Sequence, residues 1–244
     1  MRRPFLVGVS IFLILSSVQA QNLVAPGIKE LQAEVKKLDQ SIELTKRNIR
    51  TLTDVQFLPD LYMALAELHL DKARRLLAIK QIKNKGTPVG ELDLTTENRP
   101  RLEALDVYKT LRERFPTDRG LDKAVFYQAH EHRGLGQIDQ AVVLYEEITK
   151  RFTSSVFWEE AQLALGNISF DKSELDAALA YYKKILARPP GPMTPVAYYK
   201  VGWCYINKPD FFQAMLAFEA MLQQTSLIDP SKIPEEMRKS DLRE

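Results

Sequence analysis

The sequence predicts an all-α protein in which long N-terminal helices precede an array of repeated helix pairs. Its glycines and prolines stand mostly in short clusters, which leaves long stretches free of helix breakers. Near the N-terminus, apolar residues recur three and four positions apart, as on one face of a helix. Further along, one pattern of small and aromatic residues returns every 36 or 37 positions, a spacing typical of solenoid proteins.

Residues 1–20 are predicted to be a signal peptide. Arg2 and Arg3 precede the apolar run "FLVGVSIFLIL", and "SSVQA" ends in a V-x-A cleavage pattern. The apolar run is shorter than the roughly 20 residues that a membrane-spanning helix needs. We expect cleavage after Ala20 and ordinary secretion, although "RRPFL" partly matches a twin-arginine signal and leaves that route open.

The charge balance of the expected mature chain is neutral. The whole sequence has 34 Lys and Arg against 32 Asp and Glu. Two arginines and no acids lie in the predicted signal peptide, so the two classes are equal in the remainder. A neutral chain offers no electrostatic case for nucleic acid or an anionic membrane as partner. A single cysteine also excludes an internal disulfide.

Residues 21–56 carry a heptad pattern whose apolar seam is interrupted once, at Thr45. Two arrangements explain such a seam. It can form an intermolecular coiled coil, which would make the protein a homo-oligomer through residues 28–52. It can equally belong to a helix that folds back on its own domain. The seam consists of Ile28, Leu31, Val35, Leu38, Ile42, Ile49 and Leu52.

Residues 57–118 are predicted to hold a long helix, a loop and a second helix. The long helix begins near Pro59, because proline is favoured in a first helical turn. The Gly, Pro, Thr and Asn content of residues 84–100 predicts a loop. The helix that resumes at Arg101 contains the first copy of the repeat. The buried stripe expected on the long helix is Leu61, Leu65, Leu68, Ala73, Leu76 and Leu77.

The repeat combines a small residue, an aromatic residue four positions later, and an aliphatic residue or Met three positions beyond that. Its copies are Ala104/Tyr108/Leu111, Ala141/Tyr145/Ile148, Ala178/Tyr182/Ile185 and Ala214/Phe218/Met221. Twelve residues before each of the last three alanines stands a second small residue: Ala129, Gly166 and Gly202. Paired small residues let two antiparallel helices touch, while the aromatic ring fills the space beside the contact. The pattern predicts three helix pairs over residues 119–224 and a divergent pair before them.

These residues, with Pro116 and Pro190 closing helices, resemble tetratricopeptide (TPR) repeats, although the usual unit of 34 residues is slightly shorter. The mature chain also resembles exported TPR proteins of deltaproteobacteria, some of which serve gliding-motility or other cell-envelope machines. The resemblance implies a TPR α-solenoid, a periplasmic location in a Gram-negative bacterium, and protein partners in the cell envelope. Those proteins are often longer. Residues 225–244 resemble a charged tail or a truncated helix, so we expect a fragment or a reduced form.

No catalytic, cofactor or metal-binding motif is apparent, so we predict a protein that is not an enzyme. The sequence contains no G-x-S-x-G, P-loop, H-E-x-x-H or C-x-x-C pattern. His130 and His132 lie two positions apart, so on a helix they point away from each other. Cys204 has no base, cation or second cysteine near it in sequence that would lower its pKa. We therefore expect this cysteine to be buried for packing.

The resemblance implies that the first helix of each pair lines a concave groove. The inward positions predict an aromatic trough with one cation, suited to a peptide strand or helix of a protein partner. An alternative assigns some of these side chains to packing between repeats. The pattern differs from the carboxylate clamp of chaperone-binding TPR proteins, with which only Asn167 agrees. The predicted partner-binding residues are Phe126, His130, Arg133, Leu163, Asn167, Phe170, Tyr199, Trp203 and Ile206.

Three hypotheses for the function follow. The first is a non-catalytic exported scaffold that holds a protein partner in its groove within a cell-envelope complex, with motility as one such setting. The second is a coordinator of cell division or outer-membrane assembly that oligomerises through its heptads. The third is the non-catalytic arm of a larger envelope enzyme. We expect neither nucleic-acid binding nor membrane insertion after signal cleavage in any of them.

Overall fold

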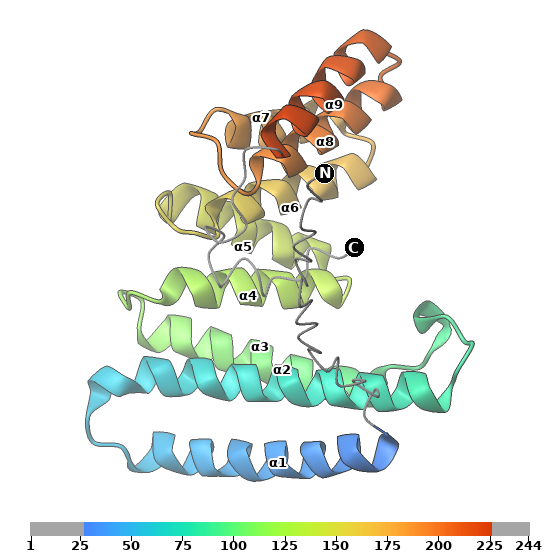
Figure 1. The fold of residues 1–244 in the computed structure, drawn as a ribbon. Coiled ribbons are helices and arrows are strands. Elements are labelled where there is room, and N and C mark those ends of the chain that lie inside the picture. Colours follow the sequence, from blue (N-terminus) through green and yellow to red (C-terminus); the bar gives the residue numbers. More distant parts are fainter. Residues whose placement is uncertain (1–26, 226–244) are drawn as a thin grey trace, which may run out of the picture.

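The computed structural model describes residues 27–225, and within this range the chain folds into helices joined by short turns and, between α2 and α3, by a longer loop (Figure 1). This confirms the all-α fold class. Successive helices run antiparallel and stack from α1 at one end to α9 at the other. The predicted signal peptide and most of the C-terminal tail lie outside the described residues. The helices are α1 (Ile28–Thr51), α2 (Leu58–Lys83), α3 (Thr95–Arg114), α4 (Leu121–Gly134), α5 (Ile138–Arg151), α6 (Trp158–Asp171), α7 (Leu175–Leu186), α8 (Thr194–Asn207) and α9 (Phe211–Thr225), with 3-10 turns at Val55–Phe57 and Val89–Glu91.

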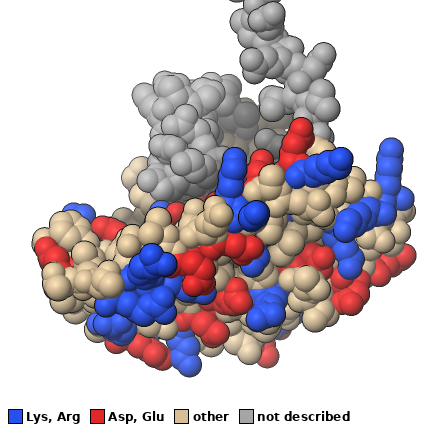
Figure 2. Space-filling model, turned by 90° about the horizontal axis from the view of Figure 1, so that it is seen from below, with Lys and Arg blue, Asp and Glu red and all other residues tan. Residues whose placement is uncertain are grey.

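The heptad helix α1 folds back along α2, which is the second of the two arrangements that its seam allows (Figure 1). Leu31 and Ile42 of the seam are buried. Two ion pairs cross between the helices, from Lys72 to Asp39 at 2.7 Å and from Arg75 to Glu34 at 2.6 Å. Figure 2 views this end of the molecule and shows acidic and basic side chains interspersed over it. The structure thus gives the seam an intramolecular partner and the outer face of α1 a mixed charge.

Helix α2 lies between α1 and α3, so it buries more of its circumference than the predicted stripe covers. Leu65 and Ala73 of that stripe are buried, whereas the other four members are only half-buried. A second buried face, directed at the main core, was not predicted because the stripe assigned α2 a single apolar face. This face includes Tyr62, Ala66 and Leu70.

Helix α3 begins at Thr95, so the predicted start at Arg101 was wrong and the loop before it is shorter. The Asp93 carboxylate accepts hydrogen bonds from the Thr95 backbone N–H at 3.0 Å and the Thr95 hydroxyl at 2.6 Å. These bonds satisfy donors of the first turn. Pro100 lies inside the helix. Because proline lacks an N–H, it removes one hydrogen bond of this early turn without ending the helix.

The paired small residues of the repeat lie at the helix contacts, as predicted. A Cβ atom added to Gly166 would stand 2.3 Å from Cε1 of Tyr182, and one added to Gly202 would stand 2.6 Å from Cε1 of Phe218. The alanines at the equivalent positions are fully or almost fully buried, and so are the tyrosines that fill the space beside them. These residues are Ala104, Ala129, Ala141, Ala178, Ala214, Tyr108, Tyr145 and Tyr182.

A recurring arginine joins successive repeats, which the sequence analysis did not identify. Arg151 at the end of α5 donates a hydrogen bond to the Pro116 carbonyl at 2.6 Å. One repeat later, Arg188 donates to the Thr153 carbonyl at 2.7 Å. The Arg188 guanidinium also lies 3.4 Å from the centroid of the Trp158 ring. Each arginine therefore ties the end of a second helix to the turn of the repeat before it.

Candidate functional site

The last helix pair exposes a continuous apolar stripe along α9. Three of its members are strongly exposed: Phe211 at 66%, Met215 at 55% and Leu222 at 66%. With Phe218, which is half-buried, they follow one another four, three and four positions apart, so they share one face of the helix. We call these four residues the terminal stripe.

An aromatic cluster extends the terminal stripe onto α8. The ring centroids of Tyr199 and Trp203 lie 6.1 and 6.3 Å from that of Phe218, and 6.2 Å from each other. These distances suit the offset and edge-to-face contacts that aromatic rings favour. Tyr199 and Trp203 each keep 42% of their surface exposed. We call the terminal stripe together with these two residues the terminal apolar face.

In the preceding repeat, a helix covers the position that the terminal stripe leaves open. Leu179 on α7 is the counterpart of Met215, and it is only 6% exposed because α8 packs against α7. Within residues 27–225 no helix follows α9, and Met215 remains 55% exposed. The terminal apolar face is therefore a surface of the kind that binds a helix elsewhere in the same molecule.

Two residues predicted to bind a partner are instead part of the core. Phe126 is 4% exposed and stacks on Phe157 with ring centroids 4.7 Å apart. Leu163 is 5% exposed within the apolar cluster of the last two described repeats. Both fill the space between repeats, which is the alternative that the sequence left open for part of the set. Their side chains offer almost no surface to a partner.

The remaining predicted site residues do not form one uniform trough. Asn167 is half-buried and its Oδ1 accepts a hydrogen bond from the Tyr182 hydroxyl at 2.9 Å. Phe170 is half-buried against the core, and Ile206 is half-buried on α8. His130 and Arg133 are half-buried and make contacts of their own. Of the nine predicted residues, only Tyr199 and Trp203 are strongly exposed.

The exposed residues of α9 were missed because the prediction placed the whole site on the first helix of each pair. "PDFFQAMLAFEAML" carried a usable signal, since Phe211, Met215 and Leu222 repeat at helical spacing. The same positions in α7 are also apolar, for example Leu179, and they are covered there. Sequence alone could not tell whether a further helix covers α9.

Cys204 is buried, as predicted, with no exposed surface. Burial raises the pKa of its thiol to about 11, so the group is protonated at neutral pH. Lys200 and Lys208 act in the opposite direction, so the expectation of no nearby cation was wrong, but burial has the larger effect. The equivalent positions in the two preceding repeats, Glu131 and Ile168, are buried as well. At Glu131 the carboxylate is compensated by Arg101, whose Nε lies 2.7 Å away. The position is therefore buried in each repeat, with an apolar or thiol side chain in two copies and an ion-paired carboxylate in the third.

None of the helices between residues 27 and 225 is long and apolar enough to cross a membrane. In the same range, no group of three or more His, Cys, Asp or Glu side chains is placed to hold a metal ion.

Solved structures share this architecture at low sequence identity. A crystal structure of MamA is 15% identical with a TM-score of 0.50, and the match covers 84% of this chain and 98% of that one. TPR-like repeats of a kinesin light chain from Podosopora anserina are 13% identical with a TM-score of 0.51, covering 82% of this chain and 89% of that one. No protein-family model and no curated protein matches the sequence. The repeat contacts and these structural neighbours together show that the chain has the fold of the tetratricopeptide-repeat proteins.

Proposed function

We propose that the protein is a non-catalytic, exported TPR scaffold that binds a protein partner of the cell envelope through its terminal apolar face. One observation carries this proposal: Met215 is 55% exposed, whereas its counterpart Leu179 is 6% exposed beneath a helix. An exposed apolar patch of this kind marks an interaction surface on a soluble protein. Tyr and Trp side chains are also the residues that most often dominate binding energy at protein interfaces.

The shape of the terminal apolar face favours an amphipathic helix as the bound element. The stripe runs along the axis of α9, and Tyr199 and Trp203 flank it from α8. A helix that presents apolar residues three and four positions apart can pack along such a stripe. Helix α8 already packs against the equivalent face of α7 in this way.

The test measures binding to the identified partner rather than capture alone. A crosslinking pull-down from the native host, read by mass spectrometry, identifies the partner, and calorimetry with the purified partner then measures affinity. Met215→Glu combined with Trp203→Ala should weaken binding at least about tenfold, since both remove apolar contact at the centre of the face. Val143→Glu is the matched control, because Val143 is 65% exposed on the outer side of α5. Equal affinity for all three proteins would overturn the proposal.

The cell-envelope setting has its own test. If residues 1–20 are a cleaved signal, the protein recovered from the periplasmic fraction should begin at Gln21. Recovery of the intact N-terminus from the cytoplasm would contradict export. Assignment to a motility complex, to cell division or to outer-membrane assembly then depends on which partner is identified. The enzyme-arm alternative is rejected if the genomic reading frame stops directly after Glu244.

A further inference from the structure

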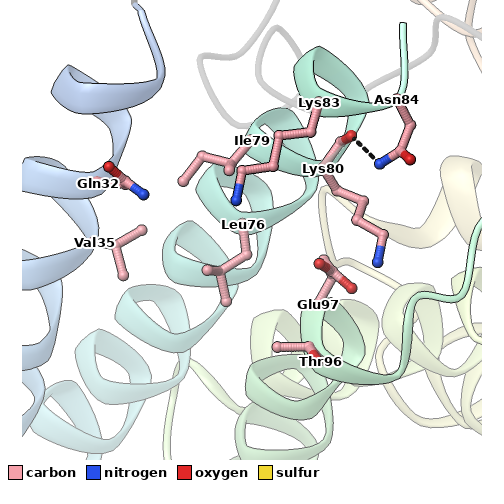
Figure 3. A pocket seen from close by; sticks show the side chains of 9 residues that line it. All are labelled: Gln32, Val35, Leu76, Ile79, Lys80, Lys83, Asn84, Thr96 and Glu97. Carbon is pink, nitrogen blue, oxygen red and sulfur yellow. Dashed lines mark hydrogen bonds between the residues drawn. The ribbon is translucent and has the colours of Figure 1, made fainter. Parts of the chain in front are cut away.

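A second candidate site lies at the other end of the molecule, in a pocket of about 500 Å³ between α1, α2 and α3 (Figure 3). Val35 of α1 and Leu76 and Ile79 of α2 form its apolar wall. Lys80 and Lys83 of α2 and Glu97 of α3 supply its charged groups. The volume lies in the range typical of small-molecule sites, which combine an apolar lining with a few convergent polar groups. This pocket is separate from the terminal apolar face.

Glu97 is the unusual member of this pocket. The residue is only 8% exposed, and its Oε2 atom has no hydrogen-bond partner among the residues that the structure describes. A buried carboxylate oxygen without a donor is costly, since it has lost water and gained nothing in exchange. Lys80 extends toward Glu97 (Figure 3), but it donates no hydrogen bond to the Oε2 atom. The pocket thus holds an acceptor that a bound donor would satisfy.

Lys80 and Lys83 are cationic, so they would be satisfied by a negatively charged group of a ligand. Both side chains line the pocket, so both amines are available to an anionic group of a ligand. A ligand with only a cationic group would satisfy Glu97 but meet the lysines unfavourably. A ligand with only an anionic group would leave the Glu97 oxygen without a donor. One molecule that carries both charges at opposite ends can satisfy Glu97 at one end and Lys83 at the other.

We propose that this pocket binds an ω-amino carboxylate, a molecule whose ammonium and carboxylate are separated by an apolar stem. The ammonium donates hydrogen bonds to the Glu97 carboxylate, and the ligand's carboxylate accepts from Lys83, whose amine lies on the other side of Leu76 and Ile79 (Figure 3). The methylene stem packs against Leu76 and Ile79, whose side chains lie along the wall of the pocket (Figure 3). This chemistry occurs both in free ω-amino acids and in a peptide that ends in lysine.

Calorimetric titration of the full chain with 6-aminohexanoate tests the proposal. We expect half-saturation at roughly millimolar concentration, as suits a ligand of this size in an open pocket. Hexanoate and hexylamine, which each lack one charged end, should bind at least about tenfold more weakly. Hexanoate binding as tightly as 6-aminohexanoate, or no saturable binding of 6-aminohexanoate, would overturn the proposal.

Substitution variants and NMR chemical shifts locate the binding site of 6-aminohexanoate. Glu97→Gln should reduce the affinity for 6-aminohexanoate at least about tenfold, since the neutral amide loses the charge-assisted bond. Glu91→Gln is the matched control on an exposed residue outside the pocket, and it should bind like the wild type. Both variants should keep the wild-type helical circular dichroism. Amide shift changes should centre on Val35, Ile79 and Glu97. Changes confined to other helices, or an unaffected Glu97→Gln variant, would contradict the site.

A peptide arm distinguishes the two sources of this chemistry. Acetyl-Gly-Gly-Lys with a free carboxylate is compared with the same peptide carrying a C-terminal amide. If the free-acid peptide binds and the amidated peptide does not, the site is assigned to the lysine terminus of a polypeptide. Binding of 6-aminohexanoate with neither peptide assigns it to a free small molecule. Equal binding of the amidated peptide would contradict the role given to Lys83.

Discussion

Gly166 sets how closely α6 and α7 approach each other. Tyr182 is fully buried and its hydroxyl is bonded to Asn167, so the ring has little freedom to move away from an added methyl group. Overpacking in Gly166→Ala should cost about 1–3 kcal/mol, and alanine regains about 1 kcal/mol in helix propensity. We therefore expect the free energy of unfolding to fall by up to about 2 kcal/mol. Urea denaturation measures the change. Gly90→Ala is the control, because its Cβ would meet nothing within 4 Å. A Gly166→Ala protein as stable as the wild type would show that the close contact is not required.

His69 makes the stability depend on pH. Its side chain is buried between α2 and α3, with Nδ1 2.9 Å from Oε2 of Glu103. Burial lowers the pKa of His69 below 6.5, and the nearby Lys46 and Lys72 act in the same direction, against the opposing effect of Glu103. The unfolded chain therefore takes up the proton first as the pH falls. The stabilisation is complete above pH 6.5 and is lost as the pH drops through the lower pKa of the folded state.

Urea denaturation at about pH 7.5 and about pH 5.5 tests this effect of His69. The wild type should lose more stability between the two conditions than a His69→Leu variant, in which no imidazole can take up a proton. Glu103 stays partly solvated and near Arg99 in that variant. Identical pH dependence in both proteins would show that His69 does not contribute.

Single positions differ in how well their roles could be predicted. The small residues and Cys204 were predictable because the repeat places the same side-chain size at the same contact in each copy. Glu97 and His69 were not, because each depends on which non-repeated helix packs over it. A lone polar residue in a helix carries no sequence signal of its own burial.

At the scale of helices, the recurring arginine holds successive pairs in register. Arg188→Met should cost about 1–2 kcal/mol, since it removes both the hydrogen bond to the Thr153 carbonyl and the contact with the Trp158 ring. Arg74→Met is the control, because Arg74 is exposed and pairs only with Asp71 on the same helix, and its loss should be within about 0.5 kcal/mol. Urea denaturation of both variants measures the two losses of stability. Equal losses would mean that the inter-repeat contact of Arg188 contributes nothing specific.

The helices of the repeats were predictable from their spacing, whereas the faces of those helices were predicted less well. Phe126 and Leu163 share the three- and four-residue spacing of Tyr199 and Trp203, but they are buried where a neighbouring repeat covers them. Helical periodicity identifies a face and not what lies against it. The start of α3 was missed for a different reason, since Thr, Asn and Pro at the beginning of a helix have the composition of a loop.

At the scale of the whole molecule, α1 packs on α2 at one end of the described helix stack, and α9 is the last helix of residues 27–225 at the other end. Because the heptad seam is packed on α2, the full chain should be a monomer in solution. Light scattering at about 50 μM tests this, a concentration at which an exposed coiled-coil seam would associate. A dimer that dissociates when Leu31 and Ile42 are replaced by alanine, with the helical content kept, would show that the seam serves association instead.

The most direct test of the account is site-specific photocrosslinking in the native host. A photoreactive amino acid is placed at Met215 in the terminal stripe and, as control, at Val143 on the outer side of α5, both strongly exposed. If the terminal apolar face is the docking site, Met215 should yield adducts with one partner protein and Val143 should not. Adducts from Met215 only to residues 226–244 of the same chain, or equal adducts from both positions, would contradict the account.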